Sequence, residues 1–154
     1  LGSVKKIHIK SYGKAAEVCG NRDPQTAFEA KFSLAYVVAI AAVTGSVRLA
    51  AFSDEWLKNI EIRRLMDRVE ITVDEKADAV FPNFRSATVE IDMADGSQLS
   101  HHSPTRRGDP DSPLSDEEIE QKFRELTDPV MNSDAQNKVI DKIWTLELQP
   151  KWVL

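Results

Sequence analysis

Alternating apolar and polar residues at the start of the chain predict a β-strand. Residues 4–12, VKKIHIKSY, place Ile7, Ile9 and Ser11 on one side of a pleat, with lysines and a histidine on the other. We therefore expect a strand with one face in water. The segment GNRDP, residues 20–24, is a dense cluster of turn-forming residues and predicts a loop after this unit.

The strongest helical pattern of the chain begins at Thr26. Thr26 is an N-cap residue type, and Glu29 follows at the capping-box position, with no glycine or proline before Gly45. Past Phe32 the segment is apolar on nearly all sides, which is typical of a helix buried at the centre of a domain. We expect one helix from Thr26 to Thr44 in that position.

Polar caps and period-two alternation predict the remaining elements. Helices are expected to begin at Ser53, Ser115 and Ser133, and Asn59 is expected to interrupt the first of them. Strands are expected over residues 69–73, 85–93 and 98–102, the last two joined by a hairpin turn at residues 94–97. Because these elements do not alternate as βαβα, the predicted class is α+β: an antiparallel-containing sheet with packed helices, in a single domain over residues 1–154.

Composition and charge narrow the classes of function. The 154 residues are 42% apolar and 29% charged, as in an ordinary soluble globular protein. The longest apolar run, residues 34–43, is shorter than the roughly 18 residues needed to cross a bilayer. The net charge of -5 disfavours nucleic acid as a partner. The single cysteine, Cys19, excludes an internal disulfide and fits a reducing compartment, so we expect a cytoplasmic protein.

Few residues carry familiar catalytic patterns. The three histidines, His8, His101 and His102, lack the spacing of metal ligands, and adjacent residues of a strand point to opposite faces. Cys19 precedes a turn and is read as a structural thiol. The six glycines are isolated, which excludes the usual phosphate-binding loops. We expect neither a metal nor a cofactor.

Three polar side chains remain as candidates. Lys31 and Tyr36 interrupt the most apolar helix, although five positions place them about 140° apart on a helical wheel. From the residues alone, a lysine in water near the helix start and a core tyrosine with a bonded hydroxyl are the favoured explanations, and a functional role is the alternative. Arg107, in the RRGD segment of residues 106–109, offers a guanidinium to a carboxylate, but a solvated loop explains it too.

A resemblance to a known family strengthens the case for functional roles of these side chains. The run NRDPQTAFEAKFSLAYVVAIAAVTGSV, residues 21–47, closely resembles a stretch of the MmgE/PrpD superfamily, whose members include 2-methylcitrate dehydratase, cis-aconitate decarboxylase and iminodisuccinate epimerase. AFSDEWL, VEITVD, DMADGSQLS, RRGDPDSPLSDEEIEQKF and a closing helix with a tryptophan follow in order. The resemblance implies the C-terminal α+β domain of such a protein, with the active site in the cleft towards a larger helical N-terminal domain that this chain lacks.

The same resemblance implies a lyase acting on a small polycarboxylate, most simply by a 2-methylcitrate dehydratase-type dehydration. It implies a catalytic role for Tyr36 and a substrate-binding role for Lys31, and we expect Arg107 to bind substrate as well. The main base would lie elsewhere, so the isolated chain is expected to be inactive. The implied partners are the helical domain, in the same protein or as a separate subunit, and a second copy in a homodimer. The alternative is a stand-alone binding or assembly module without catalysis.

Overall fold

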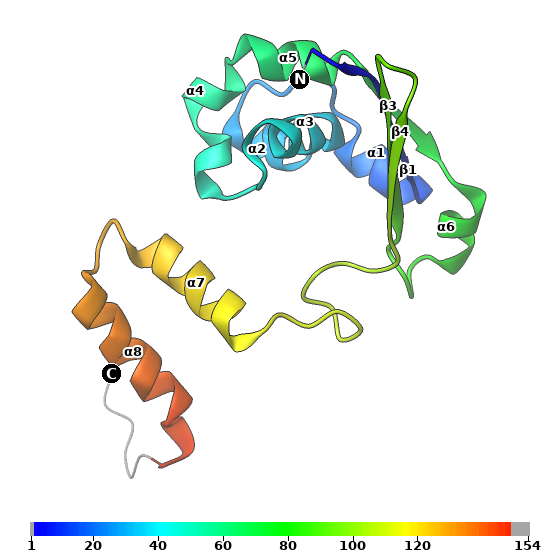
Figure 1. Cartoon of the computed structure of the whole chain (residues 1–154). Helices are drawn as coiled ribbons and strands as arrows, with labels where there is room; N and C mark the ends of the chain where they lie inside the picture. Colours follow the sequence, from blue (N-terminus) through cyan, green and yellow to red (C-terminus); the bar gives the residue numbers. More distant parts are fainter. Residues whose placement is uncertain (1, 149–154) are drawn as a thin grey trace. The chain divides into compact units, whose positions relative to one another are not determined.

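The structure, a computed structural model, describes residues 2–148. The chain divides into two compact units, Leu1–Asp111 and Ser112–Leu154. The sheet and helices α1 to α6 belong to the first unit, and α7 and α8 to the second (Figure 1). The prediction of one domain over residues 1–154 stays a prediction.

A four-stranded mixed sheet in the order β2-β1-β3-β4 frames the first unit. The central strand β1 (Val4–Ser11) pairs in parallel with β2 (Val69–Val73) and antiparallel with β3 (Ala87–Met93). β3 also pairs antiparallel with β4 (Gln98–Ser103), which is the predicted hairpin. The predicted α+β class is confirmed, whereas the parallel pair β1–β2 was not foreseen.

The two faces of β1 differ as its alternation predicts. Ile7 and Ile9 are 0% and 1% exposed, and Ser11 is buried beside them. The opposite face carries ion pairs from Lys6 to Glu70 at 2.6 Å and from Lys10 to Glu90 at 2.7 Å, and a hydrogen bond between His8 and Asp92 at 3.1 Å. The prediction of a strand with one wet face is therefore confirmed.

The prediction of one helix from Thr26 to Thr44 is wrong. The segment forms α2 (Ala27–Lys31) and α3 (Leu34–Thr44), and the chain turns between them at Phe32 and Ser33. Ser33 caps α3, because its Oγ accepts the N–H of Tyr36 at 3.1 Å and donates to the carbonyl of Asn21 at 2.6 Å. Holding both partners takes Ser33 out of the helical conformation, which the apolar pattern alone does not reveal.

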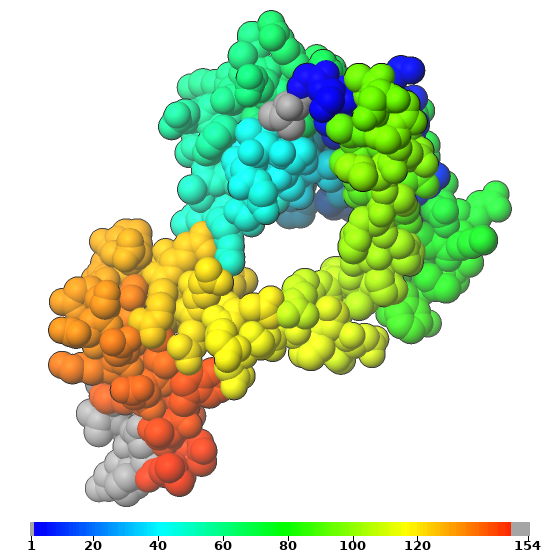
Figure 2. Space-filling model, viewed as in Figure 1, coloured from blue at the N-terminus to red at the C-terminus, as the bar shows by residue number. Residues whose placement is uncertain are grey.

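Helix α3 nevertheless occupies the centre of the first unit, as expected. Four of its side chains are fully buried: Ala35, Tyr36, Ala39 and Ile40. It packs on α5 (Ile60–Met66), which buries Ile62, Leu65 and Met66. Helices α2, α3, α4 (Asp54–Leu57) and α5 lie on one side of the sheet (Figure 1), and their side chains form one continuous mass (Figure 2). Asn59 caps α5, so the predicted interruption after α4 is confirmed.

Two short helices of the first unit were not predicted. α1 (Gly13–Cys19) follows β1 directly, and α6 (Glu75–Val80) follows β2. Asp74 caps α6 by accepting the backbone N–H groups of Lys76 and Ala77, each at 2.9 Å. Helices this short carry too little periodicity to stand out from the surrounding polar residues.

The second unit is a pair of helices, α7 (Asp116–Thr127) and α8 (Ser133–Trp144), followed by the 3-10 turn η2 (Leu146–Leu148). The capping box predicted at Ser115 is confirmed, with Glu118 as its second member. Helix α8 begins at Ser133 as predicted, and Asn132 is its N-cap. No helix in the described part of the chain is long and apolar enough to cross a membrane.

Candidate functional site

The ring of Phe52 brings two of the predicted site residues together. The Nζ of Lys31 lies 5.6 Å from the centroid of this ring, and the ring of Tyr36 lies 6.1 Å from it, centroid to centroid. Phe52 ends the 3-10 turn η1 (Leu49–Phe52) and is half-buried. The separation of about 140° expected for Lys31 and Tyr36 assumed one continuous helix, and the break at Ser33 removes it. We call Lys31, Tyr36 and Phe52 the Phe52 cluster.

Tyr36 lies in the core, with a hydroxyl that already has a partner. The side chain is 0% exposed, and its Oη donates a hydrogen bond to the carbonyl of Ala51 at 2.5 Å. Burial raises the pKa of the phenol, and the positive charge of Arg63 lowers it in part. The hydroxyl is therefore protonated near neutral pH and anchors η1. A catalytic role for Tyr36 stays a prediction.

Lys31 ends α2 with its ammonium in solvent. Among the described residues its ammonium forms no hydrogen bond or ion pair, and it lies over the Phe52 ring. Such a contact contributes about 0.5–1 kcal/mol at an exposed site and restricts the side chain without neutralising its charge. The ammonium is thus available to a carboxylate, and its role in substrate binding stays a prediction.

Arg107 lies in the loop that follows β4, outside the Phe52 cluster. The loop is held by Asp109, which accepts hydrogen bonds from Arg106 at 2.7 Å and from Thr105 at 3.0 Å. The bond from Arg106 is the main cause that lowers the pKa of Asp109. Figure 1 shows this loop leaving the end of β4 well away from α2 and α3. Arg107 is exposed, and its predicted contact with substrate stays a prediction.

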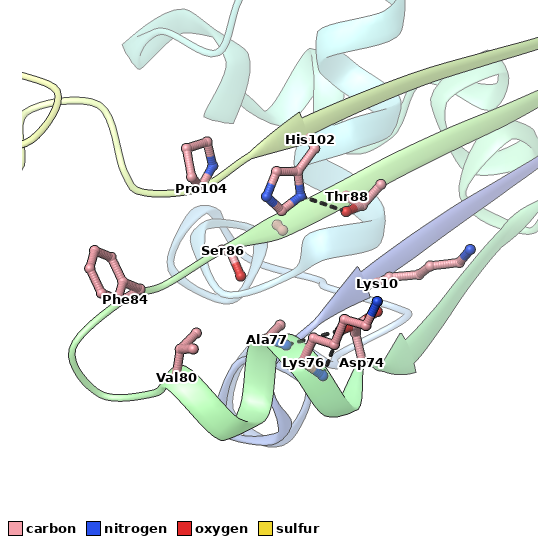
Figure 3. Close-up of a pocket in the computed structure, with 11 residues that line it drawn as sticks. Lys10, Asp74, Lys76, Ala77, Val80, Phe84, Ser86, Thr88, His102 and Pro104 are labelled. Atoms are coloured by element: carbon pink, nitrogen blue, oxygen red, sulfur yellow. Dashed lines mark hydrogen bonds between the residues drawn. The ribbon is translucent and has the colours of Figure 1, made fainter.

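The structure also contains a cavity that sequence reasoning missed. It lies between α6 and the ends of β1, β3 and β4, and its volume is about 420 Å3 (Figure 3). Its polar lining residues are Lys10, Asp74, Lys76, Ser86, Thr88 and His102. The hairpin itself was predicted, but a turn over residues 94–97 would place Thr88 opposite Ser103, whereas the structure pairs Thr88 with His102. The other members come from distant segments.

The remaining candidate residues, two histidines and one cysteine, are less suited to catalysis or metal binding. His101 and His102 lie on the exposed edge strand β4, and Nδ1 of His102 is 2.9 Å from Oγ1 of Thr88. Burial raises the pKa of the Cys19 thiol, which disfavours the reactive thiolate. Within residues 2–148, no group of three or more His, Cys, Asp or Glu side chains is placed to hold a metal ion.

Comparisons with known proteins show the family to which this chain belongs. The profile of the MmgE/PrpD C-terminal domain matches residues 1–148. Cis-aconitate decarboxylase of Homo sapiens is 27% identical to this chain over 126 residues, and that of Mus musculus is 26% identical. The alignments cover 80% of this chain but 26% and 25% of the relatives, so the chain spans about a quarter of their length. Since the profile match runs through both compact units, the chain belongs to the MmgE/PrpD family, and residues 1–148 correspond to the C-terminal domain of that family.

Proposed function

We propose that this chain is the C-terminal domain of a lyase that acts on a small polycarboxylate. In this proposal it contributes binding groups, and the main catalytic base belongs to a helical domain of the same protein or of a separate subunit. The observation that carries the proposal is the family match over residues 1–148 together with relatives that are cis-aconitate decarboxylases.

We propose decarboxylation as the reaction to test first. Both relatives are named for the decarboxylation of cis-aconitate, which favours loss of carbon dioxide over the 2-methylcitrate-type dehydration expected from the sequence. The two reactions share one electronic problem, because each leaves negative charge on carbon next to a carboxylate. A cation that binds this carboxylate stabilises the developing charge.

Lys31 is the residue of the Phe52 cluster best suited to that task. Its ammonium is exposed, and it has no ion-pair partner among the described residues. The Phe52 ring restricts the side chain, so less conformational entropy is lost when a carboxylate binds. Arg107 is proposed as a second carboxylate contact from the loop after β4.

Tyr36 is proposed to act in one of two ways, and its geometry favours the second. As a catalytic residue, it would have to give up the carbonyl of Ala51 to donate a proton to an intermediate. As a positioning residue, it keeps this bond, holds η1 in place and so keeps Phe52 against Lys31. The positioning role requires no change in the contacts of Tyr36 with Ala51 and Phe52.

The proposal is tested by comparing a longer protein, with a helical segment preceding this domain, with the 154-residue chain alone. The measurements are carbon dioxide release from cis-aconitate and dehydration of 2-methylcitrate. We expect turnover by the longer protein and none by the chain alone, because no described pair of residues in it supplies a positioned base. Turnover by the chain alone would place the base within it. A longer protein inactive on both compounds would favour the binding or assembly module.

Lys31→Ala in the longer protein tests the binding role. We expect KM to rise about tenfold, the effect of losing one charge-assisted hydrogen bond, with a smaller change in kcat. Lys31→Arg should recover most of the loss. Lys58→Ala is the matched control, because Lys58 is an exposed lysine at the end of α4, outside the cluster. Equal effects of Lys31→Ala and Lys58→Ala would contradict the assignment.

We also propose that the protein is cytoplasmic, as its single cysteine suggests, and that it forms a homodimer, as the family resemblance implies. Mass measurement in solution and cell fractionation test these two points. A monomeric longer protein, or one recovered outside the cytoplasm, would contradict them.

A further inference from the structure

The cavity beside α6 has the volume of a small-molecule site and is open to solvent on one side. Its volume of about 420 Å3 falls in the range of roughly 300–1,000 Å3 typical of small-molecule pockets. The strands β1, β3 and β4 form one wall, and α6 with the segment after it forms the other (Figure 3). All its lining residues belong to the first compact unit, and none belongs to the Phe52 cluster.

Two polar groups face this cavity without a protein partner. Ser86 is 7% exposed, and its carbonyl accepts the hydroxyl of Ser11 at 2.9 Å. The hydroxyl of Ser86 forms no hydrogen bond among the described residues. Every fully buried polar side-chain atom in the described part of the chain has a partner, so this oxygen is not fully buried and is exposed towards the cavity. Figure 3 shows it pointing towards α6. The Nε2 of His102 is also unpartnered within the described chain, since Thr88 takes Nδ1.

The charges around the cavity leave one cation available. The ammonium of Lys10 pairs with Glu90 at 2.7 Å. The Asp74 carboxylate accepts two backbone N–H groups at the start of α6, and the bond from Ala77 is the main cause that lowers its pKa. Lys76 has no ion pair within 4 Å among the described residues. The Asp74 carboxylate keeps its negative charge, and the charge of Lys76 also lowers its pKa. The Lys76 ammonium can therefore hold one anionic group, whereas the further carboxylates of a polycarboxylate would meet the negative charge of Asp74.

The rest of the lining is apolar and open to solvent. Val80 is 41% exposed and Phe84 is 47% exposed, although both are large apolar side chains. Ala77 and Pro104 extend the same surface. An inorganic anion would leave this surface wet, whereas an apolar ligand body covers it and gains about 25 cal/mol for each Å2 removed from water.

We propose that this cavity, which we call the α6 cavity, binds a small monocarboxylate with an apolar body. The carboxylate accepts hydrogen bonds from the Lys76 ammonium and the Ser86 hydroxyl, and the apolar body packs on Val80 and Phe84. His102 supplies a further polar contact at the β4 side. The proposal concerns the first unit alone and does not depend on the lyase activity.

Calorimetric titration of the whole chain with 3-phenylpropionate tests the proposal. We expect saturable binding, and roughly tenfold or more weaker binding of 3-phenylpropanol, which has the same body without the charge. Inorganic phosphate and cis-aconitate should be weaker ligands by a similar factor. Equal binding of the alcohol, the phosphate or cis-aconitate overturns the ligand class, and no binding of 3-phenylpropionate overturns the site.

Two variants locate the site. Lys76→Ala and Ser86→Ala should each weaken binding of 3-phenylpropionate, the first about tenfold and the second severalfold. Neither side chain has a protein hydrogen bond among the described residues, so the thermal midpoints should stay close to that of the parent chain, which a melting curve checks. Lys58→Ala is the control and should bind as the parent does. Unchanged binding by folded Lys76→Ala, or equal losses in Lys76→Ala and Lys58→Ala, overturns the assignment.

Discussion

The two compact units of this chain differ in what covers their apolar side chains. In the first unit, helices and sheet enclose a core in which Ile7, Ile40 and Ile62 are 0% exposed. In the second, the only side chain buried among the described residues is the polar Gln136. Both units have well-capped helices, so local signals alone do not explain the difference. What the second unit lacks is a second apolar layer.

Side-chain hydrogen bonds link the two helices of the second unit. Trp144 donates to Glu120 at 2.7 Å, Arg124 to Asn137 at 2.8 Å, and Gln136 to the carbonyl of Arg124 at 3.1 Å. Between the helices a groove of about 240 Å3 is lined almost wholly by apolar side chains: Ile119, Phe123, Val139, Ile140, Ile143 and Trp144. Two amphipathic helices of this length are marginal in water without further burial. The groove therefore marks where this unit needs additional contacts.

The largest expected effect comes from a charge in the core of the first unit. Ala39→Asp places a carboxylate at a position that is 0% exposed, in the middle of α3. The cost of roughly 4 kcal/mol or more is a large part of the stability of a small domain, so we expect the first unit not to fold. Circular dichroism and a melting curve measure this. Ala42→Asp, on the exposed side of the same helix, should fold, and a cooperative melt of Ala39→Asp would contradict the assigned core.

Matched truncations in the two units sharpen the comparison. Ile62→Ala removes a fully buried side chain of α5 and should lower the free energy of unfolding by about 2–5 kcal/mol. Ile140→Ala removes a partly exposed side chain of α8 and should cost about 1 kcal/mol or less. Denaturant titration gives both values. Equal losses would show that the second unit has a core of its own.

Tyr36→Phe separates the two roles proposed for this residue. The change leaves the carbonyl of Ala51 without its partner, so we expect a loss of roughly 1–3 kcal/mol in stability. If Tyr36 is a positioning residue, the variant of the longer protein should show a raised KM and little change in kcat, because Phe52 and Lys31 become less ordered. If the hydroxyl instead takes part in the reaction, kcat should fall by about two orders of magnitude or more with little change in KM.

The smallest expected effect is a loss of thermal stability at low pH, caused by carboxylates on the solvent-exposed face of the sheet. The hydrogen bond from Lys6 lowers the pKa of Glu70, and those from Gln98 and His8 lower that of Asp92. A carboxyl with a lowered pKa in the folded state adds stability above its unfolded pKa, and this stability is lost as pH falls through the folded pKa. We expect the melting temperature to decrease when the pH is lowered below about 4. Glu70→Gln with Asp92→Asn should flatten the profile, and an unchanged profile would contradict these pairings.

The sequence predicted what depends on near neighbours in the chain. The buried face of β1, the caps at Thr26 and Ser115 and the interruption at Asn59 follow from residues a few positions apart, and all are confirmed. The break at Ser33 was missed because it depends on the distant carbonyl of Asn21. The parallel pair β1–β2 was missed for the same reason, since nothing local marks a parallel partner.

In the candidate site, too, single residues could be predicted from the sequence, but their arrangement in space could not. Lys31 and Tyr36 could be named from the sequence, but their meeting at Phe52 requires the fold. The α6 cavity was not predicted, because it joins short segments that are separate in sequence and include the unpredicted helix α6. Only the β3–β4 hairpin that carries Thr88 and His102 was predicted, and its register differs by one residue from the one that the expected turn sets.

Hydrogen exchange of the backbone amides in the whole chain tests the contrast between the units most directly. In a unit with its own core, central amides exchange only through global unfolding, whereas helices without buried contacts open locally at little cost. We expect strong protection in β1 and α3 and little protection in α7 and α8. Protection of α7 and α8 equal to that of α3 would contradict the conclusion that the second unit lacks an apolar layer of its own.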